Sequence, residues 1–257
     1  MAREWNAVEY EEISAPQTRW GAGVLEHLDL RGDETVLDAG CGTGRVTELL
    51  LERMPHGSVL AVDGSASMVE SARERFSGDS RVRVKRQDLL ELEVDKTLDL
   101  IFSTATFHWI KNHERLFENL AKALKPGGQL VAQCGGEGNI SRSTLATSET
   151  MNEERFRRYF EDWTDDKHYA NARDTKQRLE DAGFREVETW LHDEPTPFGS
   201  VDELARFLQT VVLGGQMLRL PEEERGPFAA SVAAKIGEYD GPPMLGYVRL
   251  NMVAVRA

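Results

Sequence analysis

The chain has 257 residues, long enough for one large domain with a substantial core, and carries a formal net charge of −13. This charge opposes binding to nucleic acid, because such binding depends mainly on Lys and Arg contacts to phosphates. Without an apolar run of about 18 residues or a signal peptide, the chain is expected to be cytoplasmic and to bind no membrane. The basic run 81–86 alternates with valines, and we interpret it as a solvated strand edge.

The cysteines and histidines indicate neither a disulfide framework nor a metal site. Cys41 and Cys134 both fall at predicted strand ends, which is consistent with a reducing compartment. The six histidines are scattered, and no His-Glu-x-x-His or paired Cys-x-x-Cys motif accompanies them. We therefore expect no bound metal.

The first predicted element is a helix over Ala15–Leu28. Its apolar side is formed by Trp20, Val24, Leu25 and Leu28. Trp5 and Tyr10 precede this helix in polar surroundings and are candidate lid residues. Simple packing of an N-terminal arm is the alternative role for both.

Residues 36–44 form the most informative motif, Val-Leu-Asp-Ala-Gly-Cys-Gly-Thr-Gly. A short apolar run ends at Asp38 and is followed by Gly40, Gly42 and Gly44. This pattern predicts a strand that runs into a tight loop, where the backbone approaches a ligand closely. An amphipathic helix is expected next, from the spacing of Val46, Leu49, Leu50 and Arg53.

The loop differs from the dinucleotide fingerprint G-x-G-x-x-G. Its third glycine comes one residue early, and Arg45 stands where that glycine would be. A large cation there would crowd the end of the helix that faces a pyrophosphate. A nucleotide-binding oxidoreductase is therefore a disfavoured alternative, which NADH binding would support.

Strands and helices alternate after this loop. Further strands are predicted at Ser58–Asp63, Arg81–Arg86, Leu98–Ser103 and Gln129–Gln133. Amphipathic helices are predicted over Met68–Phe76 and Leu116–Leu124, and the second of them is stopped by Lys125–Gly128. This alternation predicts an α/β fold with a doubly wound, mostly parallel sheet.

Polar side chains mark the carboxyl ends of four of these strands. They are Asp38, Asp63, Asp88 and Ser103. Ligands of doubly wound sheets bind at the carboxyl ends of the strands. The acidic side chain at the end of the second strand, Asp63, is placed to accept hydrogen bonds from ribose hydroxyls.

The C-terminal half interrupts the alternation twice. Residues 138–172 contain five aromatic residues among many charges, too many for a flexible linker, and we interpret them as a helical cap. Residues 214–243 form a second insertion, with a helix around 227–238. Between and after the insertions we expect a crossover helix, a strand, a helix and a closing antiparallel edge strand, at Asp174–Ala182, Phe184–His192, Val201–Leu213 and Gly246–Val255.

Residues 33–135, with the motif at 36–44 and the Leu-Lys-Pro-Gly-Gly turn at 124–128, resemble the Rossmann-like class I S-adenosylmethionine (SAM) methyltransferases. The resemblance implies SAM as cofactor and S-adenosylhomocysteine as product. It implies that Asp38 accepts from the ammonium group and that Asp88 binds the adenine amino group. The cofactor-binding candidates are Arg19, Asp38, Gly40, Cys41, Gly42, Gly44, Asp63, Gly64, Met68, Asp88, Leu89, Ser103 and Thr104.

A narrower resemblance covers more of the chain. Trp5 to Tyr10, Thr18-Arg19, the segment 107–109 and the C-terminal cap look like the trans-aconitate 2-methyltransferase group, whose architecture the malonyl-carrier-protein O-methyltransferases share. The resemblance implies that the N-terminal helix and the segment after the fourth strand help to enclose SAM and the acceptor. The substrate-pocket candidates are Trp5, Tyr10, Phe107, Trp109, Glu137 and Asn139.

The cap leaves the acceptor open. Glu137 adds negative charge where a tricarboxylate would bind. Basic residues of the cap either compensate for it or form a solvated face; they are Arg142, Arg155, Arg157 and Arg158.

We expect a single methyltransferase domain over 1–257, as a monomer or homodimer. It comprises an N-terminal lid helix, a SAM-binding core, two cap insertions and two segments that complete the sheet. Their bounds are 1–32 for the lid, 33–135 for the core, 136–173 and 214–243 for the cap, and 174–213 and 244–257 for the rest of the sheet.

The predicted function is methyl transfer to a small-molecule acceptor, by O-methylation of a carboxylate or a hydroxyl. His108 is the candidate base, because it follows the fourth strand and imidazole titrates near neutral pH. A hydrogen-bonded structural role is the alternative for His108. The alternative function is a SAM-binding enzyme or regulator without methyl transfer, with cyclase-like or decarboxylase-like chemistry.

Overall fold

The computed structural model describes residues 20–257, except 22, 27, 95–96 and 239–241. The chain divides into two compact units, which are described separately. Unit 1 consists of Met1–Glu137, Asp166–Leu191 and Arg249–Ala257. Unit 2 consists of Gly138–Asp165 and His192–Val248. The expected single domain with two cap insertions stays a prediction.

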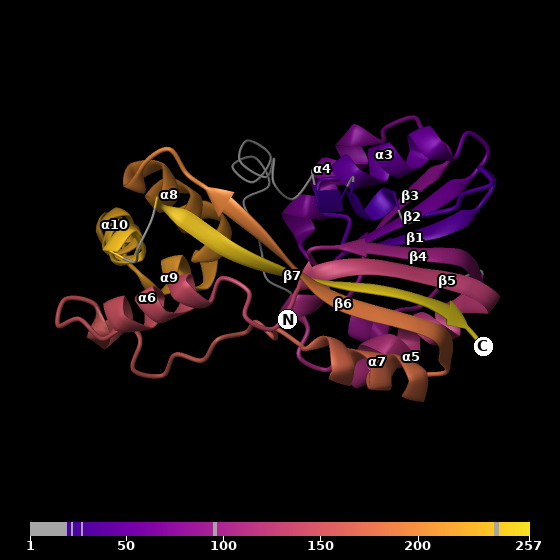
Figure 1. The fold of residues 1–257 in the computed structure, drawn as a ribbon. Helices are drawn as coiled ribbons and strands as arrows, with labels where there is room; N and C mark the ends of the chain where they lie inside the picture. The colour runs from indigo at the N-terminus through magenta and orange to yellow at the C-terminus, as the bar shows by residue number, and fades with distance from the viewer. Residues whose placement is uncertain (1–19, 22, 27, 95–96, 239–241) are drawn as a thin grey trace. The chain divides into compact units, whose positions relative to one another are not determined.

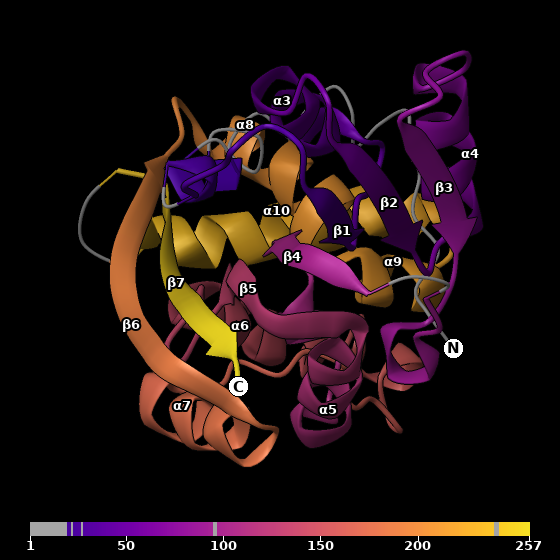
Figure 2. The same cartoon turned by 90° about the vertical axis from the view of Figure 1, so that its right-hand side faces the viewer.

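A seven-stranded sheet has the order β3-β2-β1-β4-β5-β7-β6 (Figures 1 and 2). The strands β1 to β5 run parallel to one another, and β7 runs antiparallel to β5. This confirms the predicted doubly wound, mostly parallel α/β fold. The strands are β1 Thr35–Ala39, β2 Ser58–Asp63, β3 Val82–Arg86, β4 Leu98–Thr104, β5 Leu124–Gly135, β6 Phe184–Pro197 and β7 Met244–Arg256.

The burial of each strand follows from its place in the sheet. The apolar strands β1 and β4 lie in the middle and are buried almost throughout, as expected for parallel strands covered on both faces. The basic strand β3 lies at one edge and is partly exposed, which suits charged side chains at a sheet edge.

The last strand differs from its expected position. We predicted an antiparallel strand at the edge of the sheet, but β7 lies between β5 and β6, so that β6 forms the edge. The reason is a long-range pairing: β7 bonds to β5 along Gln129–Gly135 and leaves its other side to β6. The sequence of a strand does not show which of two neighbours it will join.

Helices of unit 1 cover the sheet on both faces (Figure 1). On one face α3 and α4 pack over β1, β2 and β3, and on the other α5 packs over β4 and β5 while α7 lies beside β7 and β6. Polar side chains cap three of these helices by accepting a backbone N–H, as N-caps do. The helices are α3 Arg45–Arg53, α4 Ala66–Arg75, α5 His113–Ala123 and α7 Ala172–Asp181, and two short 3-10 turns lie at η1 Leu89–Glu91 and η2 Phe107–Trp109.

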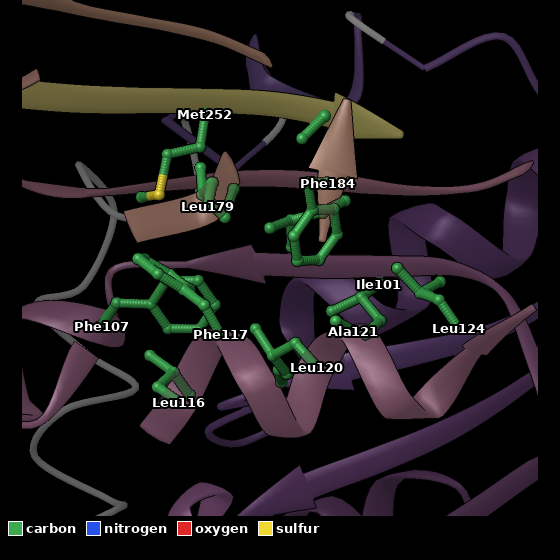
Figure 3. Close-up of a cluster of buried hydrophobic side chains, with 14 of the residues drawn as sticks. Ile101, Phe107, Leu116, Phe117, Leu120, Ala121, Leu124, Leu179, Phe184 and Met252 are labelled. Carbon is green, nitrogen blue, oxygen red and sulfur yellow. The ribbon is translucent and has the colours of Figure 1, made fainter. Parts of the chain in front are cut away.

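The larger hydrophobic core of unit 1 lies between the sheet and the helices α5 and α7 (Figure 3). Phe117 and Leu120 of α5 are fully buried and face Ile101 of β4 and Leu179 of α7 in this core. The ring of Phe107 lies in the same cluster, 6.2 Å from the ring of Phe117 and edge-on to it.

Unit 2 is mostly helical and has its own apolar centre. Its longest helix, α10, packs against α6 and α8, and Phe228 of α10 contacts Phe156 and Phe160 at ring distances of 5.1 and 5.3 Å. The predicted cap over 138–172 is helical only in part, and the helix predicted over 201–213 ends in a π-helical turn. The elements are α6 Ser141–Met151, η3 Arg157–Tyr159, α8 Val201–Phe207, η4 Leu208–Val212, α9 Gly214–Arg219 and α10 Glu222–Glu238.

No helix in the described part of the chain is both long enough and apolar enough to cross a membrane.

Replacing Leu120 by Ala tests the importance of the larger core. Leu120 is fully buried, so Leu120→Ala should lower the free energy of unfolding of unit 1 by about 2–5 kcal/mol. The matched control is Leu218→Ala on α9, where the side chain is 76% exposed and the expected change is within about 0.5 kcal/mol. Denaturant unfolding followed by circular dichroism measures both, and equal effects would contradict the assignment of the core.

Candidate functional site

The glycine loop after β1 is bonded to the end of β2. The amides of Gly40 and Cys41 both donate to the carbonyl of Val62, at 2.8 and 3.0 Å. Gly40 has φ +89°, and a Cβ there would collide with the side chain of Thr106. Gly42 also has a positive φ, +54°, but a Cβ there would meet no described atom within 4 Å. The packing therefore requires glycine at position 40, while at Gly42 the backbone can approach a ligand.

Asp63, the last residue of β2, connects this loop to α4. Its carboxylate accepts from the amide of Gly42 at 3.0 Å through one oxygen and from the amide of Ser65 at 2.8 Å through the other. Ser65 in turn caps α4. A carboxylate offers about four acceptor positions, so that each oxygen can accept more than one hydrogen bond. The arrangement fits the predicted acceptance from ribose hydroxyls.

Asp38 is buried beneath the loop, with 2% of its surface exposed. The hydroxyl of Thr47 donates to its carboxylate at 2.5 Å. Burial raises the pKa of Asp38 to about 7, the bond from Thr47 opposes this rise, and the negative charge of Asp63 adds to it. An ammonium group close to Asp38 would favour its charged form.

Asp88 stands just beyond β3 and caps η1, accepting from the amide of Leu90 at 2.9 Å. Leu89 is buried, and the amide group of Asn119 donates to its carbonyl at 3.1 Å. These bonds hold the segment after β3 at the carboxyl edge of the sheet. The roles of Asp88 and Leu89 toward adenine stay predictions.

The end of β4 carries backbone strain. Ala105 has φ +57°, an unfavourable value for a residue with a side chain. The hydroxyl of Thr106 donates to the carbonyls of Thr104 and Gly40, at 3.1 and 3.3 Å. The hydroxyl of Ser103 donates to the carbonyl of Ala39 at 2.6 Å, which joins β4 to β1. Ser103 therefore has a structural bond, and its role toward the cofactor stays a prediction.

The other predicted cofactor residues are placed as follows. Cys41 and Met68 are buried, and burial raises the pKa of the Cys41 thiol well above its ordinary value. The carbonyl of Gly64 accepts from the guanidinium of Arg86 at 3.1 Å. Trp5, Tyr10 and Arg19 lie outside the described residues.

His108 lies at the carboxyl end of β5, held by the backbone. Its Nδ1 accepts from the amide of Gly135 at 3.3 Å, and its carbonyl accepts from the amide of His168 at 2.8 Å. Its ring lies 4.9 Å from the ring of Trp109 and 5.8 Å from that of Tyr169. Its neighbour Phe107, a predicted pocket residue, is fully buried in the hydrophobic core.

A buried polar network follows β5 and β7 and was not predicted from the sequence. Arg249 is 2% exposed, its Nε donates to the side-chain oxygen of Gln133 at 3.2 Å, and its guanidinium lies 4.4 Å from the ring centre of Trp20. The amide of Gln133 donates to the side chain of Asn251 at 2.9 Å. The feature of the sequence that could have indicated this network is the alternation of Arg249 and Asn251 with apolar residues in a buried strand.

The remaining pocket candidates belong to different units. Glu137 of unit 1 is exposed, and its amide donates to the carbonyl of Ala170 at 2.9 Å. Asn139 of unit 2 is buried and accepts from the amide of Val248 at 2.9 Å.

Three basic residues of the cap are bonded within unit 2. Arg155 pairs with Glu224 at 2.7 Å, Arg157 donates to the carbonyl of Asn152, and Arg158 donates to the hydroxyl of Tyr159. These exposed contacts favour the interpretation as a solvated face.

Comparison with known proteins identifies the family. A model described as "Methyltransferase domain" matches residues 36–128. The trans-aconitate 2-methyltransferase of Sinorhizobium fredii is 30% identical over 98% of this chain and 99% of its own length. This chain belongs to the class I SAM-dependent methyltransferases of the trans-aconitate 2-methyltransferase group. The relative of that name from Rhizobium etli is 28% identical over 98% of this chain and 99% of its own length.

Solved structures agree with this fold. The YcgJ protein of Bacillus subtilis has a TM-score of 0.65 at 13% identity, with 93% of this chain and 98% of that chain covered. Phosphoethanolamine N-methyltransferase 2 of Haemonchus contortus, complexed with S-adenosylhomocysteine, has a TM-score of 0.64 at 20% identity. The alignment covers 97% of this chain and 56% of that chain. These structures support the fold, while the family model and the relatives show that the protein is a SAM-dependent methyltransferase.

Asp63→Asn tests the cofactor site of this methyltransferase. An amide cannot accept from both backbone amides and ribose hydroxyls as a carboxylate does, so the Kd for SAM should rise about 10- to 100-fold. The matched control is Asp79→Asn. Like Asp63, Asp79 accepts a hydrogen bond from the backbone amide two residues later, that of Arg81 at 3.0 Å, but it lies before β3. Calorimetric titration with SAM measures both; unchanged affinity in Asp63→Asn would contradict the assignment.

The pKa of Asp38 predicts how SAM affinity depends on pH. Below about pH 7 the buried carboxyl is protonated in the free enzyme and must lose its proton to pair with an ammonium group. Affinity should therefore rise as the pH increases from 6 to 7 and level off above 7. Asp38→Asn should bind SAM more weakly and remove this dependence, and an identical pH profile in wild type and variant would contradict the role.

Proposed function

We propose that this enzyme transfers the methyl group of SAM to a carboxylate oxygen of a small anionic acceptor. Two supporting facts are the relatives named trans-aconitate 2-methyltransferase, one of which aligns over 98% of this chain at 30% identity, and the buried guanidinium of Arg249. The guanidinium is the observation that carries the proposal, because it places a permanent positive charge in unit 1 of a chain with a net charge of −13.

The position of Arg249 in the sheet favours its binding of the acceptor carboxylate. It pairs with Gly135 in the register of β5 and β7, and Gly135 is the residue whose amide binds His108. Arg249 and His108 therefore flank the carboxyl end of β5, the edge at which ligands of such sheets bind. The bond from Nε to Gln133 fixes the plane of the guanidinium, whose fork matches the geometry of a carboxylate.

The chemistry favours a carboxylate over a hydroxyl. Bound SAM supplies a methyl group on a sulfonium, which is already an activated leaving group. A carboxylate is ionised at neutral pH and attacks without losing a proton, whereas a hydroxyl acceptor must lose one to a base. The protein then has to hold the acceptor in line and to exclude water.

Incubation with labelled SAM and a panel of acceptors tests the proposal. Di- and tricarboxylates should be converted to methyl esters, which release methanol in base, whereas acceptors with amides in place of all carboxyl groups should not react. Base-stable methyl products would show transfer to a hydroxyl, nitrogen or carbon instead and would contradict the proposal, as would tight SAM binding without any product.

Variants of Arg249 test the binding of the acceptor. Arg249→Lys keeps the charge but loses the fork, and Arg249→Gln loses both, so KM for the acceptor should rise in that order, by about 10- to 100-fold for Gln. The Kd for SAM should not change. Arg256→Gln is the control, because Arg256 lies on the same strand and donates to the carbonyls of Ala121 and Gly183. Loss of thermal stability in Arg249→Gln with unchanged KM would show a structural role only.

A further inference from the structure

Within the proposed function, on which this step rests, we infer that His108 positions the acceptor carboxylate by donating a hydrogen bond from Nε2 and is not a general base. The observation behind it is the bond from the amide of Gly135 to Nδ1 of His108, at 3.3 Å.

This bond selects one form of the imidazole. A backbone amide can only donate, so Nδ1 must accept, and an Nδ1 that accepts carries no proton. In the neutral ring the proton then resides on Nε2, which is therefore a donor. A base needs the reverse: it must receive a proton. Protonating Nδ1 would require breaking its bond to Gly135.

The surroundings hold the ring in this orientation. Tyr169 stacks against it at an interplanar angle of 26°, Trp109 lies tilted beside it at 41°, and the amide of His168 donates to its carbonyl. Positive charge lies nearby, since Lys167 is 5.7 Å from the ring centre of Trp109 and Arg249 pairs with Gly135 across the sheet. A cationic neighbourhood favours an anionic partner.

The second histidine of this region does not supply a base either. His113 contacts the carbonyl of Phe107 through Nε2 at 3.0 Å, so this nitrogen donates. Burial lowers the pKa of His113 to about 4, which keeps it neutral at the pH of the cell. Both histidines thus present donors, and the reaction they fit is one that releases no proton.

Methyl transfer to a carboxylate has this balance. The attacking oxygen forms a bond to the methyl carbon while the carbon–sulfur bond breaks. The electron pair of the carbon–sulfur bond goes to sulfur. The negative charge of the acceptor and the positive charge of the sulfonium cancel, and no proton is exchanged. A donor from His108 to the other carboxylate oxygen would orient the attacking oxygen toward the methyl group.

Two amide variants separate the two nitrogens of the ring. The side-chain amide of His108→Gln can place an N–H near the position of Nε2, whereas that of His108→Asn can place an oxygen near Nδ1 and keep the bond to Gly135. If His108 is a donor, the Gln variant should keep kcat within about tenfold of the wild type. The Asn and Ala variants should raise KM for the acceptor by about 10- to 100-fold. The Kd for SAM and the Tm are measured for each variant.

The pH profile of kcat at saturating SAM and acceptor gives the second measurement. A donor predicts a flat profile between about pH 6.5 and 9 in wild type and in His108→Gln. If log kcat of the wild type rises with pH at a slope of one, and this rise is absent in His108→Gln, His108 acts as a base and the inference is overturned. A Gln variant as impaired as Ala, with normal Tm and SAM affinity, would also overturn it.

These outcomes are separable from those of the proposed function. If no methyl ester forms with any acceptor, the proposed function is wrong. If the ester forms but log kcat of the wild type rises with pH at a slope of one, the proposed function stands and only the donor role of His108 is wrong.

Discussion

The two hydrogen bonds accepted by the carboxylate of Asp63 are the interaction on which the proposed cofactor site depends. By accepting the amides of Gly42 and Ser65, it joins the glycine loop after β1 to the first turn of α4. Both segments contribute backbone to the same carboxyl edge of the sheet. A single charged side chain thus helps to set the shape of the loop, and its proposed role is to present acceptor atoms to the ribose of SAM.

Burial gives the charged groups of unit 1 their properties. Asp38, beneath the loop, has its pKa raised to about 7 because it is removed from water, so it gains most from a cationic partner. Arg249 is buried on β7, which β4 and β5 separate from β1, and is oriented by Gln133. In a medium of low polarity each such charge interacts strongly with a ligand of opposite sign. The two ends of the proposed reaction, a cationic cofactor and an anionic acceptor, have complementary groups in this part of the protein.

The sheet was predictable because its strands are encoded locally. The apolar runs ending at Asp38, Asp63 and Ser103 each correspond to a strand of the structure, and the polar edge strand β3 was evident from its alternating charges. The position of β7 and the buried network of Arg249, Gln133 and Asn251 were not predicted. They depend on pairing between strands far apart in the chain, and an arginine in a strand normally indicates exposure. Phe107 was similarly misleading, because a residue next to two candidate pocket residues turned inward to the core.

The sequence by itself indicated a ligand-binding loop at the carboxyl ends of the strands, and its resemblance to the class I SAM methyltransferases implied the cofactor and the reaction type. Both were readable because the spacing of glycines and acidic residues along consecutive strands is a local property that folding preserves. Only the tertiary structure decided which nitrogen of His108 accepts a hydrogen bond and where the charge of Arg249 is buried. The bond from Arg249 to Gln133 joins residues 116 positions apart, and that from Gly135 to His108 joins residues 27 apart. Such contacts exist only once β4, β5 and β7 lie side by side, because the folded sheet alone brings these side chains together.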